Sequence, residues 1–206
     1  MQSVKNLLID LGGVLYEIDI DATLERYHAM QAPGAPRISF SKSEQHEAFS
    51  LLDCGQIDMD TFAQTLKNEY QLTGSLEEIK QVWMDLLVGV FEGREAQINQ
   101  LAQHYRLALL SNTSRFHYAH YAPQCAGMFE QMDHVFTSFD LGIRKPDAII
   151  YETALEKAGW KAAETCFLDD SHTNIEAAGR VGLETFWVEQ PTDFTRFINQ
   201  VLPTSA

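Results

Sequence analysis

The chain alternates short apolar runs with longer stretches in which apolar residues recur every three or four positions. Each apolar run has β-branched, aromatic or leucine residues over about four to eight positions, which is typical of strands buried on both faces of a sheet. These runs cover residues 4–10, 106–111, 134–137, 165–169 and 184–188. Helical patterns between the later runs cover residues 94–104, 147–158 and 174–181, with Gly159 and Gly182 at the expected ends of the last two. Strands alternating with helices predict an α/β fold with a doubly wound, parallel, five-stranded Rossmann-like sheet.

The interval between the first two predicted strands breaks this rhythm. From about Asp19 to Phe91 the pattern predicts helices at residues 21–30, 43–51, 60–70 and 75–87, and no strand. An insert of roughly seventy residues is far longer than a βα loop of about 2–6 residues. We therefore predict an inserted helical cap over residues 17–91, with a core of residues 1–16 and 92–206. The cap is expected to select the substrate by closing over the site. Its candidate contacts, most of which are expected to be cap core, are Tyr16, Tyr27, Phe49 and Trp83.

Charge and composition narrow the classes of partner. The formal net charge of −14, without a compensating Lys/Arg cluster, argues against nucleic acid binding. No apolar run approaches the ~20 residues needed to span a bilayer, and the N-terminus does not resemble a signal peptide. The three cysteines, Cys54, Cys125 and Cys166, are widely spaced and predict reduced thiols. We expect a cytoplasmic protein with no membrane partner, and the sequence gives no prediction of its oligomeric state.

Polar residues with chemical potential follow the predicted strands. In a parallel sheet, ligands bind beyond the carboxyl ends of the strands. The candidates are Asp10 after the first strand, Ser111 and Asn112 at the second, Lys145 shortly after the third, and Asp169 and Asp170 at the fourth. Taken singly, several have ordinary explanations, such as a helix cap for Asp10, a turn for Ser111 or a surface position for Lys145. Their order on one frame predicts that they converge on one crevice.

Each type of candidate has a chemical use in that crevice. A carboxylate such as Asp10 can attack phosphorus or carbon and form a covalent intermediate. Neighbouring carboxylates repel each other and favour a hard divalent cation such as Mg²⁺. The Ser111 hydroxyl can bind phosphoryl oxygens, and the Lys145 ammonium can compensate negative charge. Asn174 is expected to cap the helix that follows rather than bind a metal.

Four motifs in order carry a resemblance to a known family. They are Ile9-Asp10-Leu11-Gly12-Gly13-Val14, Leu110-Ser111-Asn112, Arg144-Lys145-Pro146-Asp147 and Leu168-Asp169-Asp170-Ser171. Together they resemble the haloacid dehalogenase-like hydrolase superfamily over nearly the whole chain, and the insert resembles its helical cap type. Within the superfamily, the chain is similar to small bacterial sugar-phosphate phosphatases, including the α-D-glucose-1-phosphate phosphatase kind, and to the N-terminal domain of soluble epoxide hydrolase.

The resemblance implies an activity and a role for each motif residue. The activity is Mg²⁺-dependent hydrolysis of a small phosphate monoester, such as a sugar phosphate, through an aspartyl-phosphate; the partner is thus a small phosphorylated metabolite. Implied metal ligands are Asp10, which is also the nucleophile, the carbonyl of Gly12, and Asp170 or Asp169. Ser111, Asn112 and Lys145 would bind the phosphoryl group, and Lys145 would stabilise the nucleophile.

Gly12 departs from the family pattern. Typical phosphatases of the superfamily have a second aspartate there, which acts as general acid and base and is worth about 10²–10⁴-fold in rate. Three explanations stay open: another proton donor, a good leaving group, or weak or absent activity. The candidate donors are Glu17, Asp19, His28, His117 and His172.

Two alternative functions follow from the same departure. A 2-haloacid dehalogenase also lacks the second aspartate, because halide needs no protonation. Dehalogenases of this fold work without a metal, however, and the Asp169-Asp170 pair favours one. A non-catalytic binding protein on this fold is the other alternative. Dinucleotide binding is disfavoured, because the full G-x-G-x-x-G pattern is missing after the first strand.

Overall fold

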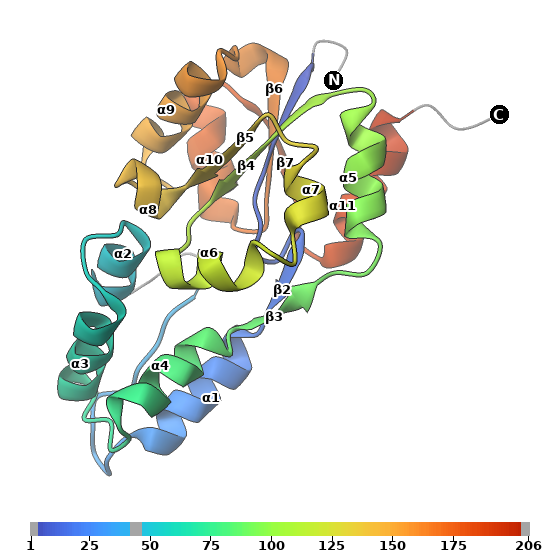
Figure 1. Cartoon of the computed structure of the whole chain (residues 1–206). Coiled ribbons are helices and arrows are strands. Elements are labelled where there is room, and N and C mark those ends of the chain that lie inside the picture. Colours follow the sequence, from blue (N-terminus) through green and yellow to red (C-terminus); the bar gives the residue numbers. More distant parts are fainter. Residues whose placement is uncertain (1–3, 42–46, 203–206) are drawn as a thin grey trace.

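The core of the structure is a parallel sheet. The computed structural model describes residues 4–41 and 47–202 (Figure 1). Its main sheet has five strands in the order β5-β4-β1-β6-β7. These strands are β1 (Asn6–Ile9), β4 (Arg106–Ser111), β5 (His134–Thr137), β6 (Thr165–Asp169) and β7 (Glu184–Trp187). All neighbouring pairs are parallel, which confirms the predicted α/β fold and all five predicted strands.

Helices cover both faces of this sheet because successive strand residues point to opposite sides. In β1, Leu7 and Ile9 pack into one hydrophobic cluster and Leu8 into another. The first cluster takes its helices from α5 (Arg94–Ala102), α6 (Arg115–Tyr121), α7 (Ala126–Phe129) and α11 (Pro191–Val201). The second takes them from α8 (Ser138–Leu141), α9 (Ala148–Ala158) and α10 (His172–Val181), beside the short 3₁₀ turn η1 (Ala162–Glu164). The inner strands β1, β4 and β6 are therefore almost entirely buried, as their apolar runs predicted, whereas the residues of β7 at the edge of the sheet are half-buried or exposed.

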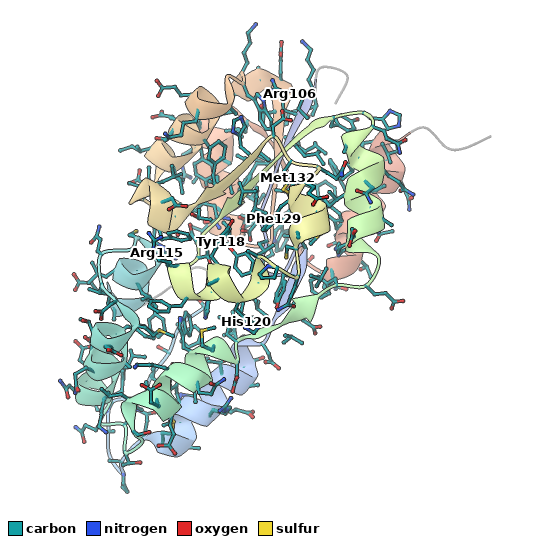
Figure 2. The ribbon with its side chains drawn as sticks, viewed as in Figure 1. Arg106, Arg115, Tyr118, His120, Phe129 and Met132 are labelled. Carbon is teal, nitrogen blue, oxygen red and sulfur yellow. The ribbon has the colours of Figure 1, made fainter. Side chains whose placement is uncertain are left out.

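The helices differ from the predictions mainly where they are short. Gly159 and Gly182 end α9 and α10 with φ of +66° and +95°, as expected for C-terminal glycines. The pattern did not predict α6, α7, α8 or α11; α7 and α8 have four residues each, too few to show a helical period. Ring contacts hold the short helices in place, with Tyr118 of α6 stacked against Phe129 of α7 at 6.5 Å (Figure 2). No helix in the described part of the chain is both long and apolar enough to cross a bilayer.

A second group of helices lies beyond the carboxyl ends of the sheet strands (Figure 1). It consists of α1 (Ile20–Met30), α2 (Glu47–Asp53), α3 (Met59–Glu69) and α4 (Leu76–Met84). These helices enclose their own hydrophobic cluster, in which Phe49 packs on Phe62 and Trp83 at 5.1 and 5.0 Å between ring centroids. The helix predicted at residues 43–51 falls partly outside the described residues. The domain boundaries at residues 16–17 and 91–92 stay a prediction.

A two-stranded antiparallel ribbon joins the two groups. It pairs β2 (Tyr16–Ile18) with β3 (Leu87–Val90), with Tyr16 opposite Val90. The prediction of no strand before Phe91 was therefore wrong. These strands have three and four residues, and the apolar positions of β3 continue the pattern of the helix before it. Strands as short as these can be recognised only from their pairing with each other.

Candidate active site

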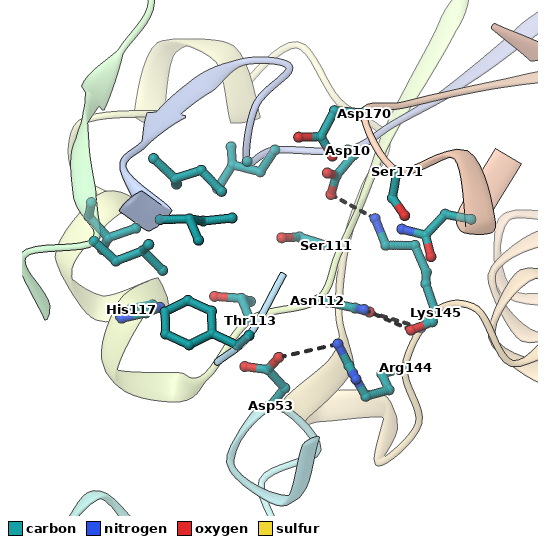
Figure 3. A pocket seen from close by; sticks show the side chains of 18 of the residues that line it. Asp10, Asp53, Ser111, Asn112, Thr113, His117, Arg144, Lys145, Asp170 and Ser171 are labelled. Atoms are coloured by element: carbon teal, nitrogen blue, oxygen red, sulfur yellow. Dashed lines mark hydrogen bonds and ion pairs between the residues drawn. The ribbon is translucent and has the colours of Figure 1, made fainter. Parts of the chain in front are cut away.

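A cavity of about 120 Å³ lies between the sheet and the helices α1–α4. The carboxyl ends of β1, β4 and β6 reach it, as does the loop before α9. They contribute Asp10, Ser111, Asp170 and Lys145 (Figure 3). The structure thus brings these residues, far apart in sequence, into one crevice.

Lys145 contacts the carboxyl ends of three strands, β1, β4 and β6. Its ammonium donates hydrogen bonds to Asp10 Oδ1 at 2.7 Å, Asp169 Oδ2 at 2.7 Å and the carbonyl of Leu110 at 2.9 Å. An ammonium has three N–H donors, so all of them are used. Its side chain is 1% exposed. This lysine is therefore built into the site and not a surface residue.

The charges in this cluster are strongly coupled. Burial raises the pKa of Asp10 to about 7; Lys145 opposes this rise, whereas Asp169 and Asp170 add to it. Burial alone would lower the pKa of Lys145, but the carboxylates of Asp10 and Asp169 outweigh it and hold that pKa above its usual value. Lys145 is therefore a cation, and its ammonium pairs with two of the three clustered carboxylates, those of Asp10 and Asp169. An additional cation would stabilise the ionised form of Asp10.

The neighbouring aspartates Asp169 and Asp170 have different surroundings. Asp169 is fully buried, and besides Lys145 it accepts hydrogen bonds from Ser171 N at 2.8 Å and Asn174 Nδ2 at 2.9 Å. Asp170 lies beside Asp10 in Figure 3 and lines the cavity. Within the described residues, Asp10, Asp169 and Asp170 each offer a carboxylate oxygen within 4.8 Å of the others. Because both oxygens of Asp169 already accept hydrogen bonds, Asp170 is the better placed partner of Asp10 for a metal.

Asn174 does not cap its helix, contrary to prediction. It is the third residue of α10, and Ser171 occupies the N-cap position. Its side chain instead donates to Asp169, and its carbonyl accepts from the Tyr151 hydroxyl at 3.1 Å. Asn174 therefore fixes the orientation of a site carboxylate.

Ser111 and Asn112 differ in what their side chains can do. Ser111, the last residue of β4, is 3% exposed and lies between Asp10 and Asn112 in Figure 3. The Asn112 amide donates to the carbonyl of Lys145 at 2.9 Å and accepts from its backbone N–H at 2.8 Å. The Asn112 side chain therefore holds the backbone of Lys145 in place. A phosphoryl contact from Asn112 would come from its backbone.

Of the five candidate proton donors, only His117 lines the cavity in the described part of the chain. Burial lowers the pKa of His117 to about 4, so the ring is neutral at pH 7, and its Nε2 lies 3.0 Å from the carbonyl of Trp83. Asp19 caps α1, and His28 bonds the carbonyl of Ile38 at 2.8 Å. Glu17 and His172 are exposed. Within the described residues four of the five candidates thus lie outside the cavity lining, and the choice of proton donor stays a prediction.

The sequence did not single out Asp53 and Arg144, which also line the cavity. Asp53 is the last residue of α2, where the helix dipole disfavours an acidic side chain. An acid at such a position is a signal that it serves another purpose. Arg144 precedes Lys145 within a quoted motif. Among the four aromatic candidates, Trp83 lines the cavity, whereas Tyr16 is buried in the sheet-side cluster and Tyr27 and Phe49 in the cluster of the helical insert.

Comparisons with known proteins agree with this geometry. D-ribitol-5-phosphate phosphatase of Bacteroides thetaiotaomicron is 26% identical over 204 residues, which cover 97% of this chain and 98% of that protein. A solved enzyme from the same organism, a mutant in complex with magnesium and inorganic phosphate, matches with a TM-score of 0.78 at 25% identity, over 89% of this chain and 93% of the other. L-2-haloacid dehalogenase from Xanthobacter autotrophicus shares the fold, with a TM-score of 0.60 at 19% identity, over 88% and 76% of the two chains.

The family itself follows from a match over most of the chain. A model of the haloacid dehalogenase-like hydrolases matches residues 4–182, which include all four motifs and the cavity residues described above. The chain belongs to the haloacid dehalogenase-like hydrolase family.

Proposed function

We propose that this protein is a Mg²⁺-dependent phosphatase that hydrolyses a small phosphate monoester, such as a sugar phosphate, through an aspartyl-phosphate on Asp10. The observation that carries the proposal is the buried cluster in which Asp10 contacts Lys145 and lies within 4.8 Å of two further carboxylates. Two comparisons support the proposal. The relative from Bacteroides thetaiotaomicron is named a phosphatase, and the solved enzyme similar to this chain is in complex with magnesium and inorganic phosphate.

The donor set fits a magnesium ion. Mg²⁺ prefers hard oxygen ligands, and it is commonly held by one or two carboxylates together with substrate phosphate. Asp10, Asp170 and the carbonyl of Gly12 would hold it. When bound, the ion would neutralise charge on the phosphate. Asp169, with its hydrogen bonds already made, would act through Lys145 and Asn174.

The residues of the chain would carry two displacements. A carboxylate oxygen of Asp10 bonds to phosphorus as the ester P–O bond breaks, and the leaving oxygen takes up a proton from solvent water. The oxygen of a second water then bonds to phosphorus and gives a proton back to solvent, the Asp10–phosphorus bond breaks, and inorganic phosphate and free Asp10 result. Ser111 and the backbone at Asn112 would bind the phosphoryl oxygens, with Lys145 compensating their charge.

The absence of a second aspartate favours a leaving group that needs little proton assistance. A Cβ on Gly12 would lie 3.3 Å from Ile18 Cδ1, so an aliphatic side chain already stands where a larger residue would extend. The small residue at position 12 therefore fits its surroundings, and we propose that the enzyme acts without an aspartate there. An anomeric phosphate or an acyl phosphate has such a leaving group.

The first test is metal dependence of phosphate release. We expect the purified protein to release phosphate from sugar phosphates in Mg²⁺, to lose at least about 10²-fold in rate with a chelator, and to recover with excess Mg²⁺. Halide release from a 2-haloacid, measured in parallel, should be absent. A rate that the chelator leaves unchanged, or halide release without metal, would instead favour the dehalogenase alternative.

A second test uses the close approach of Gly13 to Asp170. Gly13 has φ of +77°, and a Cβ there would lie 1.9 Å from Asp170 Oδ2. Gly13→Ala should therefore displace the Asp170 carboxylate and weaken Mg²⁺ affinity by about 10–100-fold, measured by calorimetric titration.

Gly93→Ala is the matched control. Gly93 has the same φ of +77°, but a Cβ there meets nothing within 4 Å. It imposes a comparable backbone strain without touching the site, so its Mg²⁺ affinity should equal that of the wild type. Equal affinities in both variants would remove Asp170 from the proposed metal site.

A further inference from the structure

The cavity has a second charged group at the end opposite Asp10. Asp53, from α2, and Arg144, from the loop before Lys145, face each other there, with Nη2 and Oδ2 3.8 Å apart. In Figure 3, Ser111, Asn112 and Thr113 lie between this pair and the Asp10–Asp170 end. A phosphate ester held at Asp10 would extend its leaving group toward the pair.

The Asp53–Arg144 pair has unused hydrogen-bonding capacity among the described residues. A separation of 3.8 Å is too long for a hydrogen bond between the two side chains. Arg144 Nη1 donates to Ser50 Oγ at 2.9 Å, but its Nε is buried without a partner in the described part of the chain. Asp53 is 5% exposed, and its burial raises the pKa of its carboxyl to about 6 even though Arg144 opposes the rise. Buried polar groups of this kind are usually satisfied, so a ligand that supplies the missing bonds would be stabilised.

The pair is also held in place before any ligand binds. Ser138 Oγ, on the sheet side, donates to the carbonyl of Asp53 at 2.6 Å. Ser50, on α2, accepts from Arg144. Each charged residue is therefore anchored across the boundary between the helical insert and the sheet. Such preorganisation lowers the entropic cost of binding a ligand.

The surroundings of the pair indicate which leaving group fits. Much of the nearby cavity wall is apolar, from Ile18, Ile20, Phe40, Trp83, Leu86 and Leu87. A hydroxyl both donates and accepts, so one hydroxyl can donate to Asp53 while its neighbour accepts from Arg144. A second anionic group would be repelled by Asp53, and a cationic group by Arg144.

We propose that Asp53 and Arg144 together bind neighbouring hydroxyls of the leaving group and so select polyol and sugar phosphates over phosphate esters without hydroxyls. This inference rests on the proposed phosphatase function. It assigns specificity to two residues that bind the substrate outside the reacting atoms, and it names the chemistry that they read. Sites built to bind a hydroxyl discriminate strongly against an analogue that lacks it, because the polar groups are then left unpaired.

The test compares substrates of matched shape with and without hydroxyls. D-ribitol 5-phosphate is paired with n-pentyl phosphate, and D-glucose 6-phosphate with cyclohexylmethyl phosphate, so that both members of each pair release a primary alcohol. For each enzyme, kcat/KM is measured for both members of a pair in Mg²⁺. Asp53→Asn should lower kcat/KM for at least one hydroxylated substrate by about 10–100-fold and change that of its hydroxyl-free partner by less than about threefold. Arg144→Gln should act in the same direction from the other side of the pair.

Asp85→Asn is the matched control within the helical insert. Asp85 pairs with Arg26 on the surface, outside the cavity lining. Its substitution should leave both members of each substrate pair unchanged. Melting temperatures monitor the fold, and Asp53→Asn should not lower its own, because burial disfavours the ionised carboxyl that it replaces.

The outcomes separate the two proposals. An equal fall for both members of every pair would give Asp53 a structural role and overturn the specificity inference, as would no fall for any substrate. A wild-type enzyme without preference for hydroxylated substrates would overturn it too, while leaving the phosphatase function intact. A wild-type protein that releases no phosphate from any of the four esters, nor from α-D-glucose 1-phosphate with its anomeric leaving group, would instead contradict the proposed function.

Discussion

Asp10→Asn is expected to lose at least about 10⁴-fold in kcat for phosphate release while remaining folded. An amide is almost the same shape as a carboxylate, and its oxygen can still accept the hydrogen bond from Lys145 that Asp10 Oδ1 accepts at 2.7 Å. It lacks the negative charge needed to attack phosphorus. Steady-state phosphate release in saturating Mg²⁺ measures the loss, and mass spectrometry of acid-quenched protein should find a phosphorylated species only in the wild type.

Asp133→Asn supplies the control for this substitution. Asp133 also accepts a hydrogen bond from a cation at 2.7 Å, from Arg106 Nε, but it does not line the cavity. Its activity should match the wild type. An Asp10→Asn enzyme within about tenfold of the wild-type rate would refute covalent catalysis by Asp10. If Asp10→Asn had the same effect in the cell as the wild-type protein, the non-catalytic alternative would be favoured.

Lys145→Met is expected to abolish activity and to lower the free energy of unfolding by about 3–5 kcal/mol at pH 7.5. The wild-type ammonium satisfies Asp10, Asp169 and the carbonyl of Leu110, and the variant leaves all three buried without it. Urea unfolding in the presence of a chelator measures the difference without compensation by a bound metal. Lys161→Met, at a side chain that is 80% exposed, should change the free energy of unfolding little.

The deficit of Lys145→Met should shrink at lower pH. Without the lysine, the pKa of Asp10 rises beyond its wild-type value of about 7, against an unfolded value near 3.8. Between those values the folded variant binds more protons than its unfolded state, so its stability increases as the pH falls. The wild type gains stability in the same way below about pH 7, so the two proteins differ in proton uptake only above that pH. The loss of stability in the variant should therefore be larger at pH 8.5 than at pH 7. A variant as stable as the wild type at pH 7.5 would contradict the proposed role of Lys145 as the central cation.

The prediction of the sheet succeeded because each strand carries its own signal. Buried parallel strands such as β1 and β6 are continuous apolar runs. Asp10 follows β1 directly and Asp169 ends β6, and a carboxylate at such a buried position needs a partner. The predicted helix ends at Gly159 and Gly182 likewise need only the local preference for positive φ. The motif residues Asp10, Ser111, Asp169 and Asp170 were predicted to converge because the carboxyl ends of parallel strands meet at one edge of the sheet.

The predictions that failed concern features that depend on tertiary partners or on very short segments. β2 and β3 are strands only because they pair with each other, and α7 and α8 are too short to show a period. Asn174 was expected to cap α10, but Asp169 beside it offered a buried acceptor that a sequence pattern does not display.

The sequence by itself determined the α/β class, the family motifs and the set of residues available for chemistry, because strand period and strand-end position are local properties of the chain. Only the tertiary structure decided which contacts each of those residues makes. Asp169 accepts hydrogen bonds from Lys145 and Asn174, Asp170 lies beside Asp10, and Asp53 lies opposite Arg144. The physical reason is that an oxygen already bound by two donors has little capacity left for a metal. Donor and acceptor can lie far apart in the sequence, as Lys145 and Asp10 do at 135 residues, so a local pattern does not show which oxygens are occupied.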